Sequence, residues 1–236
     1  MDTTNRLHFF VSIALILSIG LVLVGTQALG GDKERDVIER GGIGVALLNL
    51  TDLNSSLEDE GYESFDGTVL VTSGGGHLNV TDNLRIGGIG YQGSTDTSFT
   101  DGNGDLAIKF GGLLLEGKFG LTDSLSFLAG GLAGMGTLDL KINESIPETF
   151  SGALTDTPNT HHLTKNYFGI QPSLVVELAI FPWLSLRANA SYLWGPAEGW
   201  DLAGQKISGP LNQVSAPIFG LSFHLGGTGA SKGEDV

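Results

Sequence analysis

Apolar residues alternate with small or polar residues along most of the chain after Gly41, and the period is two rather than 3.6. A period of two places successive side chains on opposite faces of a β-strand. The clearest alternating segments are 168–180, 184–194, 113–121 and 219–225. Each predicts a strand with one apolar face and one face of polar or small residues.

Counting such segments predicts about eight strands and an all-β chain. They lie near residues 42–50, 67–80, 84–95, 105–121, 125–140, 164–181, 184–195 and 214–225. Most of them offer the roughly nine to eleven residues that a tilted strand needs to cross a bilayer.

The connections between these strands are of two kinds. Three are tight turns, at 81–83, 122–124 and Pro182, and each is followed at once or one residue later by a leucine that opens the next strand. The others are long and run over about 51–66, 96–104, 141–163 and 196–213. Every tight turn follows an even-numbered strand and every long connection an odd-numbered one.

This sorting predicts an antiparallel up-and-down β-barrel of about eight strands. In such a meander all tight turns gather at one end of the barrel, together with both termini, and all long loops gather at the other. Short turns at one end and long loops at the other are typical of outer-membrane barrels.

The first long connection departs from the period of two. Leu53 and Leu57 are four residues apart, acidic residues lie outside that spacing, and Gly61 stands in a helix-stop position. The segment 51–62 therefore predicts a short amphipathic helix. The spacing fits a helix that caps the barrel mouth and also one that packs on the barrel's end.

The N-terminal segment predicts export. An apolar run over 9–24 follows Arg6 and precedes the small-x-small sequence Thr26-Gln27-Ala28. We expect a signal peptide over 1–28, a polar leader over 29–40, a barrel domain over 41–225 and a flexible polar tail over 226–236. The alternative is an uncleaved anchor, because a run of this length can span a bilayer as a helix.

Composition excludes several classes of function. The formal net charge is −14, from 26 acidic and 12 basic residues, which argues against a nucleic-acid partner because a phosphate backbone needs a basic surface. There is no cysteine, so disulfides, thiolate metal sites and a cysteine nucleophile are absent. The 37 glycines indicate turns, bulges and closely approaching strands.

The hairpin units VTDNLRI, LTDSLSF and FPWLSLR, the sorted loops and the closing Phe219-x-Leu221-x-Phe223-x-Leu225 resemble the small eight-stranded outer-membrane β-barrel proteins. More narrowly, ALLNLTDLNSSLEDEGY, VLVTSGGGHLNV and LRIGGIGYQG are similar to segments of glycine-rich exported proteins of unassigned function. The resemblance implies an outer-membrane location, with a secreted or periplasmic one as the alternative, and contact with membrane lipid through the outward apolar face.

Interfacial aromatic girdles are expected of such barrels. The candidates near strand ends are Tyr91, Phe119, Phe181, Trp183, Tyr192, Trp194 and Phe223. Aromatic residues are also common in strands of every kind, which is the alternative account of these seven.

If the apolar faces contact lipid, five charged residues face the lumen: Arg85, Glu116, Lys118, Glu177 and Arg187. Buried charges need partners, and three basic groups can largely neutralise two acidic ones. Because an eight-stranded barrel is just wide enough for side chains to fill, the prediction is a plugged interior rather than an open channel. His77 and His224 are expected on the same lumen face.

Residues with metal-binding or catalytic chemistry are few. Asp101, Asn103 and Asp105 alternate like the ligands of a calcium loop, but an EF-hand would need Gly and Glu where the chain has Leu106 and Gly112. A looser calcium site competes there with an ordinary polar turn. No other metal, no cofactor and no catalytic residues are expected, since no G-x-S-x-G elbow or HExxH spacing occurs.

Three functions compete at this stage. The first is a structural or surface-interaction barrel of the cell envelope, whose acidic long loops meet an envelope or surface partner. The second is a lipocalin-like barrel, soluble or membrane-bound, that holds a small apolar ligand or lipid. The third is a lipid-modifying enzyme on a barrel. A soluble lipocalin-like cup requires the apolar faces to turn inward.

Overall fold

The computed structural model describes residues 38–99, 102–144 and 159–225. Its elements are β1 (Ile38–Leu47), α2 (Thr51–Asp59), β2 (Thr68–Thr81), β3 (Leu84–Phe99), β4 (Gly102–Gly120), β5 (Leu125–Glu144), β6 (Asn159–Phe181), β7 (Leu184–Pro196), β8 (Trp200–Leu202), β9 (Gln205–Ile207) and β10 (Gln213–Leu225). The expected signal peptide and polar tail lie outside the described residues, as does most of the polar leader.

Eight of the strands close into a barrel. Each long strand pairs antiparallel with its neighbours in the order β5-β4-β3-β2-β1-β10-β7-β6, and a further pairing of β5 with β6 completes the ring. The first and last strands meet along a seam in which Glu39 lies opposite Leu225 and Ala46 opposite Ile218. Closure pairs the edges that would otherwise expose backbone groups. The predicted eight-stranded up-and-down barrel is confirmed.

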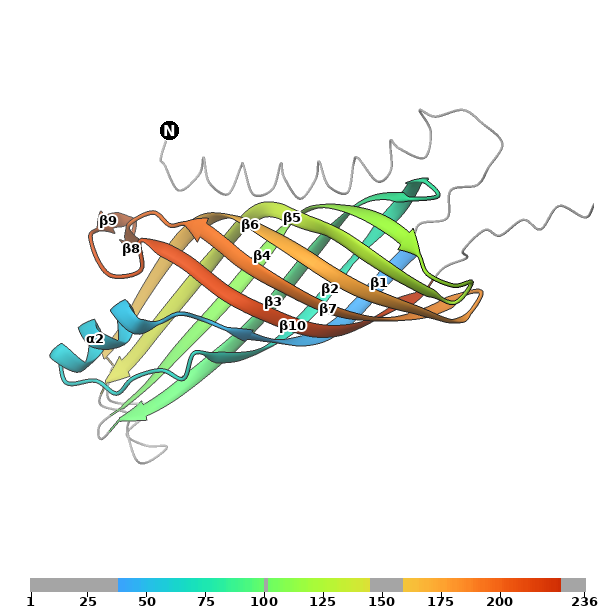
Figure 1. The fold of residues 1–236 in the computed structure, drawn as a ribbon. Helices are drawn as coiled ribbons and strands as arrows, with labels where there is room; N and C mark the ends of the chain where they lie inside the picture. The colour runs from blue at the N-terminus through green and yellow to red at the C-terminus, as the bar shows by residue number, and fades with distance from the viewer. Residues whose placement is uncertain (1–37, 100–101, 145–158, 226–236) are drawn as a thin grey trace, which may run out of the picture.

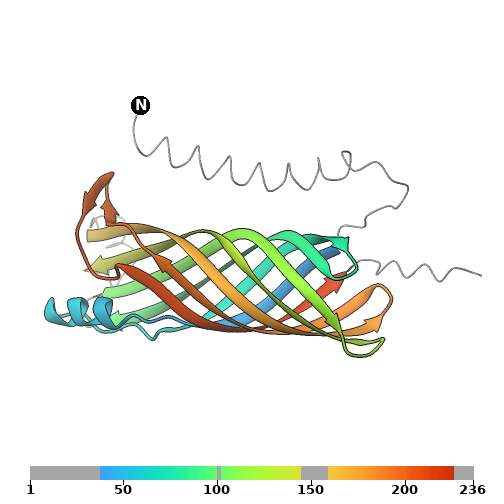
Figure 2. The ribbon, with the colours of Figure 1, turned by 45° about the horizontal axis from the view of Figure 1, so that its top comes forward.

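The two ends of the barrel differ as predicted. The tight turns between β2 and β3, β4 and β5, and β6 and β7 lie together at one end (Figure 1). The helix α2 and the β8–β9 hairpin lie at the opposite end in both views (Figures 1 and 2). The start of β1 and the end of β10 are both at the tight-turn end. We call the opposite end the long-loop end.

One predicted long connection is wrong. The segment 96–104 is mostly strand, because β3 runs to Phe99 and β4 begins at Gly102. Asp96 lies opposite Asp105 in the ladder, and the pairing continues to the end of both strands. Polar and glycine residues look like a loop in the sequence, yet they form strands here because each neighbouring strand supplies a hydrogen-bonded partner. The connection over 141–163 is likewise shortened, since β5 extends to Glu144 and β6 starts at Asn159.

The last long connection contains a small hairpin that the alternation did not predict. The strands β8 and β9 have three residues each and are joined by Ala203 and Gly204, both with positive φ (52° and 86°). Two positive φ angles are the requirement of a type I′ turn. Leu202 pairs with Leu163 of β6, so the hairpin continues the barrel wall.

The predicted helix is confirmed and packs on the barrel's end. Leu53 and Leu57 are buried and belong to the same core cluster as Leu48 and Phe65. The Asn54 amide ties the segment between α2 and β2 to the helix, since its Nδ2 donates to the Phe65 carbonyl (3.0 Å) and its Oδ1 accepts from the Phe65 N–H (3.1 Å). No helix in the described ranges has the length and apolar character of a membrane span.

Candidate functional site

The outer wall carries a band of exposed large apolar side chains. On β6, Phe168 and Leu174 are each 54% exposed, and the outward positions between Phe168 and Ile180 are apolar throughout. We call this band the apolar belt; its other members on β4, β5, β7 and β10 are Leu113, Leu115, Phe119, Met135, Tyr192, Trp194, Phe219, Leu221, Phe223 and Leu225. The apolar faces of these strands therefore point outward, whereas a soluble lipocalin-like cup requires them to point inward.

The apolar belt ends before the strands do. Beyond Gly111 on β4 and Met135 on β5, the outward side chains turn polar toward the long-loop end. We call these residues the polar collar: Asp105, Lys109, Asp139, Lys141 and His162. Lys109 Nζ lies 3.1 Å from Asp139 Oδ2, and His162 Nε2 lies 3.8 Å from Asp139 Oδ1.

Six of the seven candidate girdle aromatics are exposed on the wall or at its turns: Phe119, Phe181, Trp183, Tyr192, Trp194 and Phe223. Phe181 and Trp183 stack at the β6–β7 turn, with ring centroids 5.6 Å apart. The prediction of an interfacial position is wrong for Tyr91, because it is buried inside the barrel with its ring 5.6 Å from that of Phe110. Glycines on both sides of Tyr91 hide the apolar alternation that would have shown which way it points.

The tight-turn half of the lumen is filled by charged residues. Arg85 binds Glu177 through both guanidinium ends, Nη1 to Oε2 at 2.6 Å and Nη2 to Oε1 at 2.9 Å. Arg187 Nη2 donates to Glu116 Oε1 at 2.6 Å. These four side chains are almost fully buried, and such charge-assisted bonds are the strong class of protein hydrogen bonds.

The fifth predicted lumen residue lies at the edge of the same cluster. Lys118 Nζ is 3.4 Å from Glu177 Oε1, and its side chain is a quarter exposed. Arg85, Glu116, Lys118, Glu177 and Arg187 come from four different strands and are brought together by the barrel's closure. Removal of Arg187 would leave Glu116, and removal of Glu177 would leave Arg85, without its ion-pair partner inside the wall.

Three further residues join this cluster. His224 Nε2 lies 3.0 Å from Arg187 Nη1, and the rings of His77 and His224 are 4.9 Å apart. Arg40 of β1 also projects into the lumen, and its Nε and Nη1 atoms are buried. The sequence interpretation placed Arg40 in the polar leader, because most of the residues from Asp32 to Glu39 are charged. We call the eight residues together the charged layer.

The long-loop half of the lumen is filled mainly by apolar and aromatic side chains, together with the buried Lys165, whose Nζ lies 5.0 Å from the Trp200 ring centroid. Leu106, Ile108 and Leu193 are fully buried there, and the rings of Phe110 and Tyr167 stack with centroids 5.8 Å apart. We call Leu106, Ile108, Phe110, Leu138, Leu140, Tyr167 and Leu193 the apolar layer. The Tyr167 hydroxyl donates to the Lys109 carbonyl at 3.1 Å, so the one polar group of the stack is satisfied.

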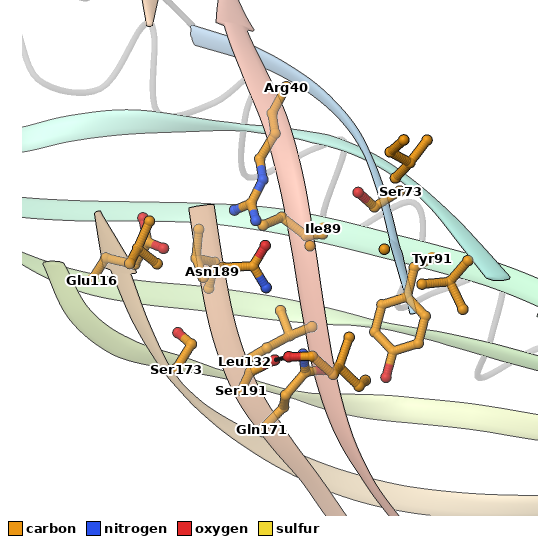
Figure 3. A pocket seen from close by; sticks show the side chains of 17 residues that line it. Arg40, Ser73, Ile89, Tyr91, Glu116, Leu132, Gln171, Ser173, Asn189 and Ser191 are labelled. Atoms are coloured by element: carbon orange, nitrogen blue, oxygen red, sulfur yellow. Dashed lines mark hydrogen bonds between the residues drawn. The ribbon is translucent and has the colours of Figure 1, made fainter. Parts of the chain in front are cut away.

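A cavity of about 60 Å³ separates the two layers. Arg40, Glu116 and Tyr91 reach it from opposite sides, and Ser73, Ser173, Asn189 and Ser191 line its wall (Figure 3). Gln171 Nε2 donates to Ser191 Oγ at 2.8 Å across one side of it. The cavity is small, and its wall mixes these polar side chains with apolar ones such as Ile89, Leu132 and Val175, whereas a bound lipid would need a large apolar pocket.

The calcium candidate stays a prediction. Asp101 lies outside the described residues, and Asn103 accepts a hydrogen bond from the Asn143 amide at 2.8 Å. Asn103 and Asp105 are both outward positions of β4, so the segment is strand rather than loop. Within the described ranges, no group of three or more His, Cys, Asp or Glu residues is arranged to hold a metal ion.

The α2 segment is also fastened to the barrel by a polar contact outside the wall. The Tyr62 hydroxyl donates to Glu144 at the end of β5, and the Tyr62 ring packs edge-on against Phe99 at 5.2 Å. The hydrogen bond to Glu144 is the main cause that raises the pKa of Tyr62 above its usual value. The first long connection is therefore held in place on the barrel's end.

No family model and no curated protein matches the chain. Solved structures similar to it include Ail, the attachment invasion locus protein of Yersinia pestis, in complex with the heparin analogue sucrose octasulfate. That match has 11% identity and a TM-score of 0.48, and covers 82% of this chain and 99% of Ail. Neisserial surface protein A has 10% identity and a TM-score of 0.47, with coverage of 80% and 96%.

The N-terminal β-barrel domain of Pseudomonas aeruginosa OprF has 10% identity and a TM-score of 0.32, with coverage of 80% and 97%. These similar structures are small outer-membrane β-barrel proteins, as the resemblance in the sequence suggested. At such identities the likeness concerns the fold alone. The architecture of this chain rests on its own strand pairings.

Proposed function

We propose that this protein is an outer-membrane β-barrel with a side-chain-filled lumen and a structural or surface-interaction role. The observation that carries the proposal is the apolar belt. Monomeric soluble proteins rarely expose continuous apolar surface of this extent, whereas a spanning barrel requires it. The polar collar marks where the wall leaves the hydrocarbon at the long-loop end.

The filled lumen supports a structural role over transport. The charged layer and the apolar layer occupy the two halves of the interior, and the cavity between them is about 60 Å³. A water-filled pore needs a wider ring of strands than eight. We expect no step-like conductance from the purified protein in planar bilayers, and steady single-channel currents would reject the filled lumen.

The long-loop end supports the surface-interaction role. It presents α2, whose outward residues include Asp52, Glu58 and Asp59, and the β8–β9 hairpin. Contacts such as Asn54 with Phe65 hold these elements to the barrel. Ordered acidic elements outside the membrane suit a partner that carries positive charge. The partner itself is a surface or envelope component.

A matched pair of variants tests the membrane assignment. Leu115→Arg places a charge in the apolar belt, and Asn103→Arg places the same charge on an outward position of the same strand beyond the belt. We expect Leu115→Arg to lower the free energy of unfolding by about 2–4 kcal/mol in lipid vesicles and Asn103→Arg by about 0–1 kcal/mol. Urea titration with tryptophan fluorescence measures both.

Fractionation provides the second test. The folded protein is expected in the outer-membrane fraction, with migration on a gel that changes on heating. Equal small effects of the two arginine variants, together with a mature protein that stays in solution without detergent, would overturn the membrane assignment and favour a soluble barrel.

A further inference from the structure

The charged layer does not balance. It holds three guanidinium groups, Arg40, Arg85 and Arg187, against the two carboxylates Glu116 and Glu177. Arg85 and Arg187 are buried, whereas Arg40 is half-buried with its Nε and Nη1 atoms out of contact with solvent. Lys118 adds another positive charge at the partly exposed edge. A net positive charge remains within the part of the wall that the apolar belt surrounds.

The histidines do not change this count. Arg187 Nη1 can only donate, so the contact at 3.0 Å makes His224 Nε2 the acceptor, and an accepting nitrogen carries no proton. His224 is therefore neutral when this bond is made. Within the described residues, no carboxylate lies at ion-pair distance from His77.

Arg40 carries the excess charge. Both carboxylate oxygens of Glu177 accept hydrogen bonds from Arg85, and Glu116 Oε1 accepts one from Arg187. The Nε and Nη1 atoms of Arg40 are buried and have no hydrogen-bond partner among the described residues. Leaving buried guanidinium nitrogens without a hydrogen-bond partner or counter-charge is costly, so a partner for Nε and Nη1 is expected.

The Arg40 side chain points into the cavity between the layers (Figure 3). At about 60 Å³ the cavity has room for a small ion together with water. Ser73 and Ser173 line it with hydroxyl groups, and the Asn189 amide adds a further donor. The Ser191 hydroxyl also lies on the wall, but it donates to the Ile218 carbonyl at 3.3 Å. Hydroxyl, amide and guanidinium donors are the groups that bind an anion.

We propose that this cavity binds one small monovalent anion, of the size of chloride, against Arg40. The anion neutralises the third guanidinium, and the serine and asparagine donors complete its shell. Glu116 Oε2 also lines the cavity without a partner and is the competing acceptor. Two alternatives compete with a bound anion: a direct ion pair between Arg40 and Glu116, and a cavity filled by water alone. The tests below distinguish the three.

Bromide replaces chloride in the direct test. Crystals of the detergent-purified protein grown in sodium bromide are expected to show one anomalous peak in the cavity, within hydrogen-bonding reach of Arg40 Nε or Nη1. Arg40→Gln crystals should lack that peak. Only water in the cavity of the unaltered protein, or an Arg40 guanidinium paired with Glu116, would overturn the proposal.

Linkage gives an independent measurement that needs no crystal. Stability to urea is measured in sodium chloride and in sodium gluconate at equal ionic strength, because gluconate is too large for the cavity. Above the dissociation constant of the site, each tenfold rise in chloride should raise the folding equilibrium constant by up to about tenfold. Gluconate should have no such effect.

Variants assign the effect to the lumen. Arg40→Gln is expected to abolish the chloride dependence, and Lys109→Gln in the exposed polar collar should keep it. Equal behaviour in the two salts, or a chloride effect that survives in Arg40→Gln, contradicts the site. If Arg40→Gln does not fold, the bromide peak and the salt comparison in the unaltered protein still decide. None of these results depends on the fractionation of the protein or on a partner at the long-loop end.

Discussion

The two halves of the barrel place most of their apolar side chains on opposite faces of the wall. In the tight-turn half, Glu116 and Arg187 face inward while Leu113 and Leu115 face outward. In the long-loop half, inward positions are mostly apolar, with Lys165 as a buried exception, and the outward positions form the polar collar. The first half resembles a membrane protein and the second a soluble β-barrel, within one continuous set of strands.

The strand β4 shows how the change is made. Its apolar side chains occupy even positions at Leu106 and Ile108 and odd positions at Leu113 and Leu115. The exchange falls around Gly111 and Gly112, where no side chain is present on either face, and Leu114 just beyond them is still an inward apolar residue. The backbone ladder with β3 and β5 runs through this point without interruption. A barrel can therefore pass from lipid to water by changing the parity of its apolar residues alone.

Breaking the charged layer is expected to have the largest effect. Arg187→Met removes the partner of Glu116 and leaves a carboxylate unpaired in the wall. We expect a loss of about 3–5 kcal/mol in the free energy of unfolding, measured by urea titration in detergent micelles. A loss below about 1 kcal/mol would show that water reaches Glu116 and that the layer is not sealed.

The apolar layer is expected to respond as the core of a soluble protein does. Leu138→Ala removes a side chain that is 1% exposed and should cost about 3 kcal/mol through lost burial and the cavity left behind. Its control is Met135→Ala, an outward residue of the same strand. If both variants lose the same stability in micelles, the long-loop half is not packed as described.

The polar collar is expected to matter least. Lys109→Met breaks the exposed pair with Asp139 and should change stability by less than about 1 kcal/mol. High salt should remove even this difference, whereas the Arg187→Met loss should persist because buried pairs are screened much less. A salt-dependent loss for Arg187→Met would place the charged layer in contact with solvent.

The sequence predicted the fold because the tight-turn half follows one rule throughout. Apolar rows such as 168–180 keep one parity across the whole belt, and the polar turns before Leu84, Leu125 and Leu184 set the strand order. Arg85, Glu116, Lys118, Glu177 and Arg187 followed from the same rule, since they occupy the opposite face. The structure brings all five together.

The long-loop half was predicted less well because its rule is reversed. Asp96 and Asp105 look like loop residues when every strand is assumed to face lipid, although they lie opposite each other in a ladder exposed to water. The parity change between Ile108 and Leu113 was visible in the sequence and would have revealed the apolar layer. Arg40 gave no comparable signal, because β1 begins among charged residues and its first inward positions include glycines.

The seam between β1 and β10 also constrains the order of events during folding. Glu39 pairs with Leu225, so the two strands that meet there are nearly the full length of the described chain apart. Every other neighbouring pair in the ring is joined by a single connection and can form locally. The ring therefore cannot shut until its final strand has arrived, and contacts between such distant segments are slow to form. Until then, Gly42 and Gly44 lie on the unpaired edge of β1. A larger residue at either position would hinder pairing with β10, because its Cβ would come within 3 Å of a β10 carbonyl oxygen.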